Sequence, residues 1–270
     1  MAPMQLDRTG LALRVGRMEQ LASIRRLAAE DGKGRGMRVW EVGNGSGLAF
    51  TVYPDRGLDI GRASIHGVPV AWISANHEVA PAFHEPEGAG WLRSWGGGLL
   101  TGCGLANVGT PCVAGGESLG LHGRLSHLPA EEVNATAGWT AEGRYALEIS
   151  GVVSETRVFG TKLRLRRSIA TALGDNRITV RDTVENTGFA PAPCLLLYHI
   201  NLGWPLVDAG ARLEAEPHRV VPRDARAAAG LERWMLIDPP APDFAEQVFY
   251  HEIPAGPDGL ATMRLQNGAR

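Results

Sequence analysis

The order of apolar and polar residues along the chain predicts a protein built from short β-strands. The segments 145–153, 162–169 and 177–184 alternate apolar and polar residues, which places the apolar ones on one face of each strand. Turns rich in glycine and asparagine separate them, and Gly-Asn-Gly between the runs 37–41 and 48–53 predicts a hairpin. Because no strand–helix–strand alternation occurs, we predict an all-β fold, an antiparallel sandwich.

The N-terminal part of the chain is ambiguous. Met18, Leu21 and Ile24 have the spacing of a helix face, whereas the run 23–27 suits a strand equally. Farther along, no linker and no internal repeat requires a second domain. We therefore predict a single domain covering residues 1–270.

Composition and charge restrict the class of protein. The chain has 270 residues with 35 glycines, 17 prolines and a formal net charge of -2, which argues against binding nucleic acid or an acidic membrane. Its three cysteines, Cys103, Cys112 and Cys194, cannot all pair, and free thiols suit a reducing cytoplasm. No apolar run approaches the ~20 residues that a membrane helix needs. We expect no secretory signal and a cytoplasmic location.

The stretch 194–205, CLLLYHINLGWP, combines an apolar run with polar residues at its end. It predicts a buried strand that reaches the edge of a sheet. His199 and Asn201 would share one face of this strand, with Tyr198 and Ile200 on the other. Such a pair of polar side chains suits a binding cleft. It suits equally well a core histidine and asparagine that are satisfied by hydrogen bonds.

A second group of histidines and aromatic residues lies earlier in the chain. Trp95 precedes a run of three glycines, and aromatic faces suit the C–H faces of sugar rings. His122 lies between two glycines, where it is either a site residue or a structural histidine in a turn. His127 follows five residues later. Common zinc sites place two histidines one helical turn apart or at alternate residues of a strand, and this spacing matches neither. We therefore predict no metal site.

A short polar turn, PDRGLDIG, supplies a further candidate. Arg56 would bind a substrate oxygen or pair with Asp55 or Asp59. The loop 76–90 follows, and we expect its two histidines to be exposed. Loops of this length in compact domains are often functional.

Taken together, five segments resemble the uncharacterised aldose 1-epimerase-like family (DUF4432-type) of the galactose mutarotase-like superfamily. They are PDRGLDIG, WGGGLLTGCGL, GLHGRLSHLPA, YHINLGWPL and EQVFYHE. The resemblance implies an antiparallel β-super-sandwich of galactose mutarotase-like type whose concave face binds a sugar, without a cofactor. Mutarotases of this superfamily use two histidines and a carboxylate. His122 matches the histidine that binds or polarises the sugar, and His199 matches the one that protonates the ring oxygen.

A sugar cleft also needs fixed polar groups and an aromatic face. We expect these substrate contacts from Arg56, Trp95, Asn107, Arg124, Asn201, Glu246 and Gln247. The hexose-phosphate branch of the superfamily has an arginine at the position of Trp95. The resemblance therefore favours a substrate without a phosphate group.

The family's glutamate base is expected after Arg270, so we expect the chain to lack the family's C-terminal strands and to turn sugar over slowly. Glu246 is then the first carboxylate to test as the base. An unpaired strand edge invites association, which makes a homodimer one expected outcome. Three functions stay open: an aldose epimerase, a sugar-binding protein without turnover, or another epimerase, isomerase or lyase reaction on an oxidised sugar.

Overall fold

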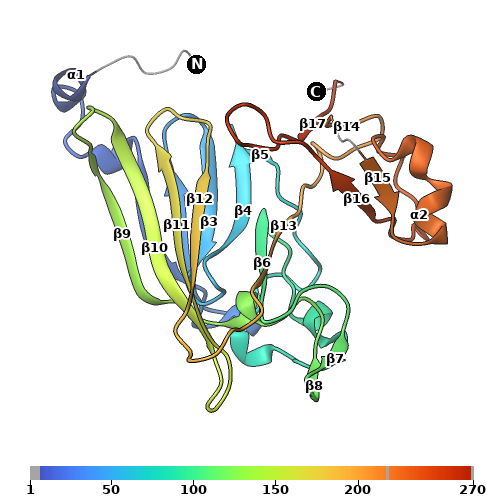
Figure 1. Cartoon of the computed structure of the whole chain (residues 1–270). Coiled ribbons are helices and arrows are strands. Elements are labelled where there is room, and N and C mark those ends of the chain that lie inside the picture. Colours follow the sequence, from blue (N-terminus) through green and yellow to red (C-terminus); the bar gives the residue numbers. More distant parts are fainter. Residues whose placement is uncertain (1–6, 217–218, 269–270) are drawn as a thin grey trace. The chain divides into compact units, whose positions relative to one another are not determined.

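The computed structural model describes residues 7–216 and 219–268, which are mostly β-strands joined by turns (Figure 1). The chain divides into two compact units, the first ending at Asn201 and the second beginning at Leu202. The single domain predicted for residues 1–270 stays a prediction, and Arg270 lies outside the described residues.

The larger sheet of the first unit joins strands from both ends of that unit. Its neighbouring strands are all antiparallel, and a short strand β5 (Val68–Pro69) pairs with β4. The order is β1 (Ser23–Ala28), β2 (Arg38–Gly43), β3 (Leu48–Tyr53), β4 (Asp59–Ile65), β6 (Leu100–Leu105) and β13 (Leu195–Ile200). The ambiguous N-terminal segment is thus a short 3₁₀ turn, η1 (Met18–Gln20), followed by strand β1.

The second sheet is an antiparallel meander. Its order is β12 (Thr179–Asn186), β11 (Lys162–Ala172), β10 (Tyr145–Thr156) and β9 (Glu131–Trp139). The apolar faces of both sheets form one buried cluster, with Phe50 and Ile60 from the larger sheet and Leu147 and Leu165 from the smaller. The predicted all-β, antiparallel sandwich is confirmed.

The remaining elements are short. The first unit also contains α1 (Arg8–Ala12), the hairpin of β7 (Cys112–Ala114) and β8 (Glu117–Leu119), and the 3₁₀ turns η2 (Gly32–Gly34), η3 (Pro81–Phe83), η4 (Gly90–Arg93) and η5 (Leu125–His127). The second unit contains β14 (Arg212–Glu214) paired with β17 (Arg264–Gln266), β15 (Arg219–Pro222) paired with β16 (Phe249–Glu252), α2 (Ala225–Ala229) and η6 (Leu231–Arg233). Within the described residues, no helix has the length and apolar character to cross a membrane.

Strand β13 differs from its prediction. Leu195 and Leu197 are 40% and 39% exposed, so the apolar run does not make a buried strand. The reason is its position, because β13 is the last strand of its sheet among the described elements and pairs with β6 alone. In that ladder His199 lies opposite Thr101 and Tyr198 opposite Gly102.

Candidate functional site

Two histidines and two tryptophans from separate segments meet on the larger sheet. We call Trp91, Trp95, His122 and His199 the aromatic–histidine cluster. The His122 and His199 rings lie edge to face, with centroids 5.5 Å apart and planes at 84°. The ring centroids of Trp91 and His122 lie 4.8 Å apart. Those of Trp95 and His199 lie 5.2 Å apart, and this second pair is also edge to face. The structure therefore brings together the two predicted catalytic histidines and one predicted aromatic contact.

Strands and neighbouring rings hold the tryptophans in place. Nε1 of Trp95 donates to Oγ1 of Thr101 at 3.2 Å, and Thr101 is the ladder partner of His199. Trp91, on η4, is only 2% exposed and stacks on Trp95 at 4.9 Å. Trp72 packs on Trp95 at 5.1 Å and is 41% exposed. The cluster thus continues into an exposed aromatic face, the kind of surface that suits a sugar ring.

The turn that carries His122 requires a glycine at position 123. The φ of His122 is 60° and that of Gly123 is 73°, both in the left-handed region. The backbone N–H of His122 donates to the Gly109 carbonyl at 2.9 Å, and its carbonyl accepts from the Gly104 N–H at 3.0 Å. A Cβ at Gly123 would lie 2.4 Å from the carbonyl oxygen of Asn107. The glycine therefore lets this turn press against the end of β6.

One ring nitrogen of His199 has no hydrogen-bond partner within the described protein. This atom, Nδ1, is buried. Buried polar atoms in folded proteins are nearly always paired, so an exception needs an explanation. An ordered water or a bound ligand would supply the missing partner.

A second histidine pair lies in the interior. His84 stacks on His127, with ring centroids 3.9 Å apart and planes at 16°. Nε2 of His127 lies 2.9 Å from Oγ of Ser94 and 3.3 Å from Nη2 of Arg56. Burial, followed by the charge of Arg56 and by His84, lowers the pKa of His127 to about 2, so this ring is neutral.

The exposed position predicted for the loop histidines is wrong for His84. Both of its ring nitrogens are buried and unpaired among the described residues. Burial, followed by the charges of Arg56 and Arg124, lowers its pKa. His77, by contrast, is 61% exposed at its side chain. No local pattern separates these two histidines, because only the fold stacks one of them on His127.

Arg56 is an interior residue. It is 4% exposed, and its Nη1 donates to the Val79 carbonyl at 2.7 Å. Burial lowers its pKa, against the charge of Asp59. Asp55 pairs instead with Arg38, at 2.6 Å. Of the roles considered for Arg56, the structure favours charge balance with Asp59, and it adds a contact with His127 that was not predicted.

The remaining predicted substrate contacts of the first unit differ in whether their polar groups are already bonded within the protein. They are Asn107, Asn201 and Arg124. Asn107 donates to the Gly120 carbonyl at 2.7 Å, and Asn201 donates to the Gly98 carbonyl at 2.8 Å. Both amides are thus engaged by backbone, and each residue is 8% exposed. The Arg124 side chain is 52% exposed. With Asn107 it lines a polar cavity of about 90 Å³.

Residues 34–270 match the family model described as "Domain of unknown function (DUF4432)". The chain belongs to this family. Among solved structures, a "putative aldose 1-epimerase" from Klebsiella pneumoniae is similar over 93% of this chain and 67% of that one, at 27% identity and a TM-score of 0.86. Galactose 1-epimerase from Lactobacillus acidophilus aligns over 76% of this chain and 60% of that one, at 12% identity and a TM-score of 0.48. No protein with curated annotation matches.

The family match and the similarity to the Klebsiella structure confirm the resemblance to the uncharacterised aldose 1-epimerase-like family and the antiparallel β-super-sandwich that it implies. The roles of its individual residues stay predictions.

Two of the predicted substrate contacts, Glu246 and Gln247, belong to the second unit. Glu246 accepts from Nη2 of Arg223 at 3.0 Å, and its side chain is 73% exposed. The side chain of Gln247 packs against Gly230. Their contact with substrate stays a prediction.

A groove larger than the cavity beside Asn107 and Arg124 lies elsewhere on the same sheet. It measures about 520 Å³ and covers β1 to β4, where Arg25, Glu41 and Arg62 are among its lining residues. None of the predicted site residues lines it. Size alone therefore does not locate the chemistry, and we assign the site to the aromatic–histidine cluster. Among the described side chains, no group of three or more histidines, cysteines and carboxylates is placed to hold a metal ion.

Replacing Asp59 by asparagine is expected to steepen the loss of stability in acid. Burial raises the pKa of Asp59 from 3.8 to about 7, against the charge of Arg56, the Gly102 N–H and the charge of Arg167. The folded state therefore binds this proton at a higher pH than the unfolded chain, and Asp59 adds stability as the pH falls from 7 to 4. His127 acts in the opposite sense, because its folded pKa of about 2 lies below its ordinary 6.5.

Without Asp59, the stabilisation that offsets the acid-sensitive effect of His127 and His84 is lost. The difference in unfolding free energy between parent and Asp59→Asn should then grow as the pH falls from 7 to 4, on the order of 1.4 kcal/mol for each pH unit. Urea unfolding at several pH values measures it. Parallel curves for the two proteins would contradict this account.

Proposed function

We propose that this protein is an aldose 1-epimerase (mutarotase)-like enzyme that interconverts the anomers of a free or modified monosaccharide by acid/base ring opening. The observation that carries the proposal is the His122–His199 pair, 5.5 Å apart between ring centroids and walled by Trp91 and Trp95. The similarity to an aldose 1-epimerase-like structure supports the same reaction class.

The chemistry requires two proton transfers. A proton leaves the anomeric hydroxyl while another reaches the ring oxygen, and the C–O bond to the ring oxygen then breaks. The open-chain aldehyde rotates and closes on its other face. Histidine suits such steps because its ordinary pKa is near 6.5.

We assign His199 as the acid that protonates the ring oxygen and His122 as the group that binds or polarises the sugar. The buried Nδ1 of His199, which has no partner among the described residues, supports the use of this ring for a substrate contact. The reaction also needs a base that takes the anomeric proton, and the family resemblance implies a carboxylate for this step. Trp95 and Trp72 would face the C–H side of the sugar.

A sugar-binding protein without turnover is the second candidate. It is favoured by the state of three predicted sugar contacts, because Arg56, Asn107 and Asn201 each donate to a backbone carbonyl within the protein. Fewer fixed donors then remain for orienting a substrate in the transition state.

One experiment separates these functions. Freshly dissolved anomers of neutral aldoses, deoxy sugars and uronic acids are followed by polarimetry, with and without the protein, and binding is followed by tryptophan fluorescence. We expect at least one sugar both to change the fluorescence and to equilibrate faster than in buffer, equally after dialysis against a chelator. A fluorescence change without acceleration supports the binding protein. No response to any sugar overturns both.

A further inference from the structure

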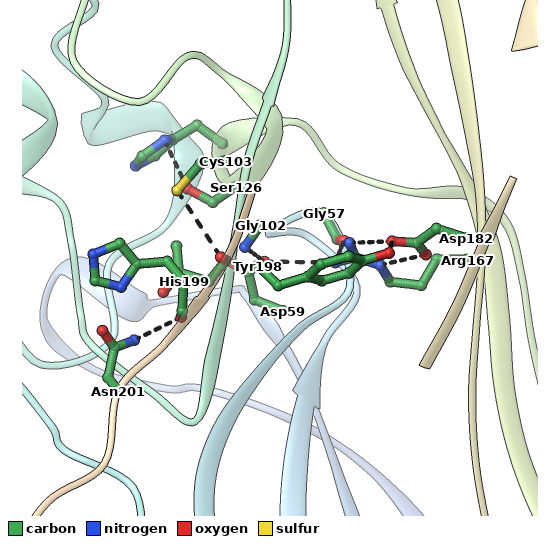
Figure 2. A network of polar contacts seen from close by, with 12 residues as sticks. Gly57, Asp59, Gly102, Cys103, Ser126, Arg167, Asp182, Tyr198, His199 and Asn201 are labelled. Atoms are coloured by element: carbon green, nitrogen blue, oxygen red, sulfur yellow. Dashed lines mark hydrogen bonds and ion pairs between the residues drawn. The ribbon is translucent and has the colours of Figure 1, made fainter. Parts of the chain in front are cut away.

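Tyr198 and His199 are neighbours on β13, and their side chains point to opposite faces of the strand (Figure 2). His199 belongs to the aromatic–histidine cluster. The Tyr198 hydroxyl instead donates to Oδ2 of Asp182 on β12 at 2.9 Å. Since β12 belongs to the smaller sheet, this hydrogen bond joins the two sheets directly behind His199.

Asp182 is held in turn by a buried arginine. Nε and Nη2 of Arg167 donate to its two carboxylate oxygens, at 2.9 and 2.7 Å. The side chains of Arg167 and Asp182 are 0% and 2% exposed. Nη1 of Arg167 donates to the Gly57 carbonyl at 3.1 Å and lies 3.9 Å from Oδ1 of Asp59. Such a bidentate pair fixes geometry as well as charge.

Asp59 extends this network to β6. Its Oδ1 accepts the backbone N–H of Gly102 at 2.7 Å, and Gly102 lies opposite Tyr198, one step from the partner of His199. A Cβ at Gly102 would lie 3.2 Å from Nη1 of Arg167 and 3.3 Å from Oδ1 of Asp59. The network therefore fills the space behind both strands at the position next to His199.

This arrangement bears on the placement of the histidine. Among the described strands, β13 pairs only with β6, so ladder hydrogen bonds hold it from one side. An acid/base group must be held to within about 0.5 Å of its productive position. A buried ion network is often no more stabilising than apolar side chains of the same size, so stability alone is weak grounds for its presence.

We propose that Tyr198 is a positioning residue for His199, acting through Asp182 and Arg167. The hydroxyl anchors β13 to the smaller sheet and so fixes where the His199 ring stands against Trp95 and His122. The kinetic part of this inference rests on the proposed function, whereas the placement of the ring does not.

The test removes one oxygen atom. Tyr198→Phe keeps the ring and loses only the hydrogen bond to Asp182. We expect kcat for anomer interconversion to fall roughly 10-fold with little change in KM, because a misplaced acid still binds substrate. We also expect the ring signals of His199 to shift in NMR spectra of histidine-labelled protein. His199→Gln assigns these signals by their disappearance, and Asp182→Asn, which weakens the acceptor, should shift the same signals.

Tyr53→Phe is the matched control. Its hydroxyl also donates to a carboxylate, Glu78, at 2.8 Å, and Tyr53 lies on β3, which does not pair with β13. This variant should leave the His199 signals and kcat unchanged. If the His199 signals of Tyr198→Phe superimpose on those of the parent, the positioning role is overturned. A parent that accelerates no sugar overturns the proposed function instead, and the NMR comparison still decides the positioning role.

Discussion

His199→Ala is expected to lower kcat for anomer interconversion about 100- to 1,000-fold, the usual contribution of a positioned general acid. The unfolding temperature should change little, because Nδ1 of His199 has no hydrogen-bond partner among the described residues that the substitution would strand. Polarimetry on a sugar that the parent accepts measures the rate, and circular dichroism measures unfolding.

Two variants sharpen this result. His199→Gln keeps a polar side chain of similar length but cannot exchange a proton near neutral pH, so it should be as slow as the alanine variant. Ile200→Ala changes the next residue on β13, which is 61% exposed, and should keep the parent rate. A parent-like rate in His199→Ala would remove His199 from the mechanism.

Arg167→Met is expected to destabilise the protein by about 3–5 kcal/mol, because it leaves a buried carboxylate without its counter-charge. The Asp182 side chain is 2% exposed and loses both charge-assisted hydrogen bonds from Arg167. Urea unfolding monitored by tryptophan fluorescence gives the free energy of unfolding.

The same strand provides the control. Arg166, the next residue, has a side chain 54% exposed and lies 3.9 Å from Glu132, so Arg166→Met should cost less than about 1 kcal/mol. The double variant Arg167→Met with Asp182→Leu should recover much of the loss, because no unpaired charge then remains. Equal costs for Arg166→Met and Arg167→Met would refute the account of the buried pair.

The order of apolar and polar residues was sufficient to predict the strands of the smaller sheet. The predicted segments 145–153, 162–169 and 177–184 lie close to β10, β11 and β12. The alternation predicts these strands correctly because one face of each strand packs in the sandwich core. Every second side chain must therefore be apolar. The run 194–205 also contains the predicted strand, with His199 facing away from Tyr198 (Figure 2).

The proximity of His122 and His199 could not be read from spacing. The family resemblance predicted their pairing, and the fold brings their rings to 5.5 Å. Strand β6 supplies the reason, since its Gly104 N–H donates to the His122 carbonyl at 3.0 Å while its Thr101 lies opposite His199.

By itself, the sequence determined the strand pattern, the all-β class and, through its motifs, the family. Only the tertiary structure decided that β13 is exposed, that Arg56 is enclosed, and that His84 stacks on a neutral His127. It also decided that Arg167 and Asp182 of the smaller sheet meet Asp59 and Tyr198 of the larger sheet. Local alternation records which face of a strand is buried, whereas burial at an edge and the partners of a buried charge depend on residues distant in the chain.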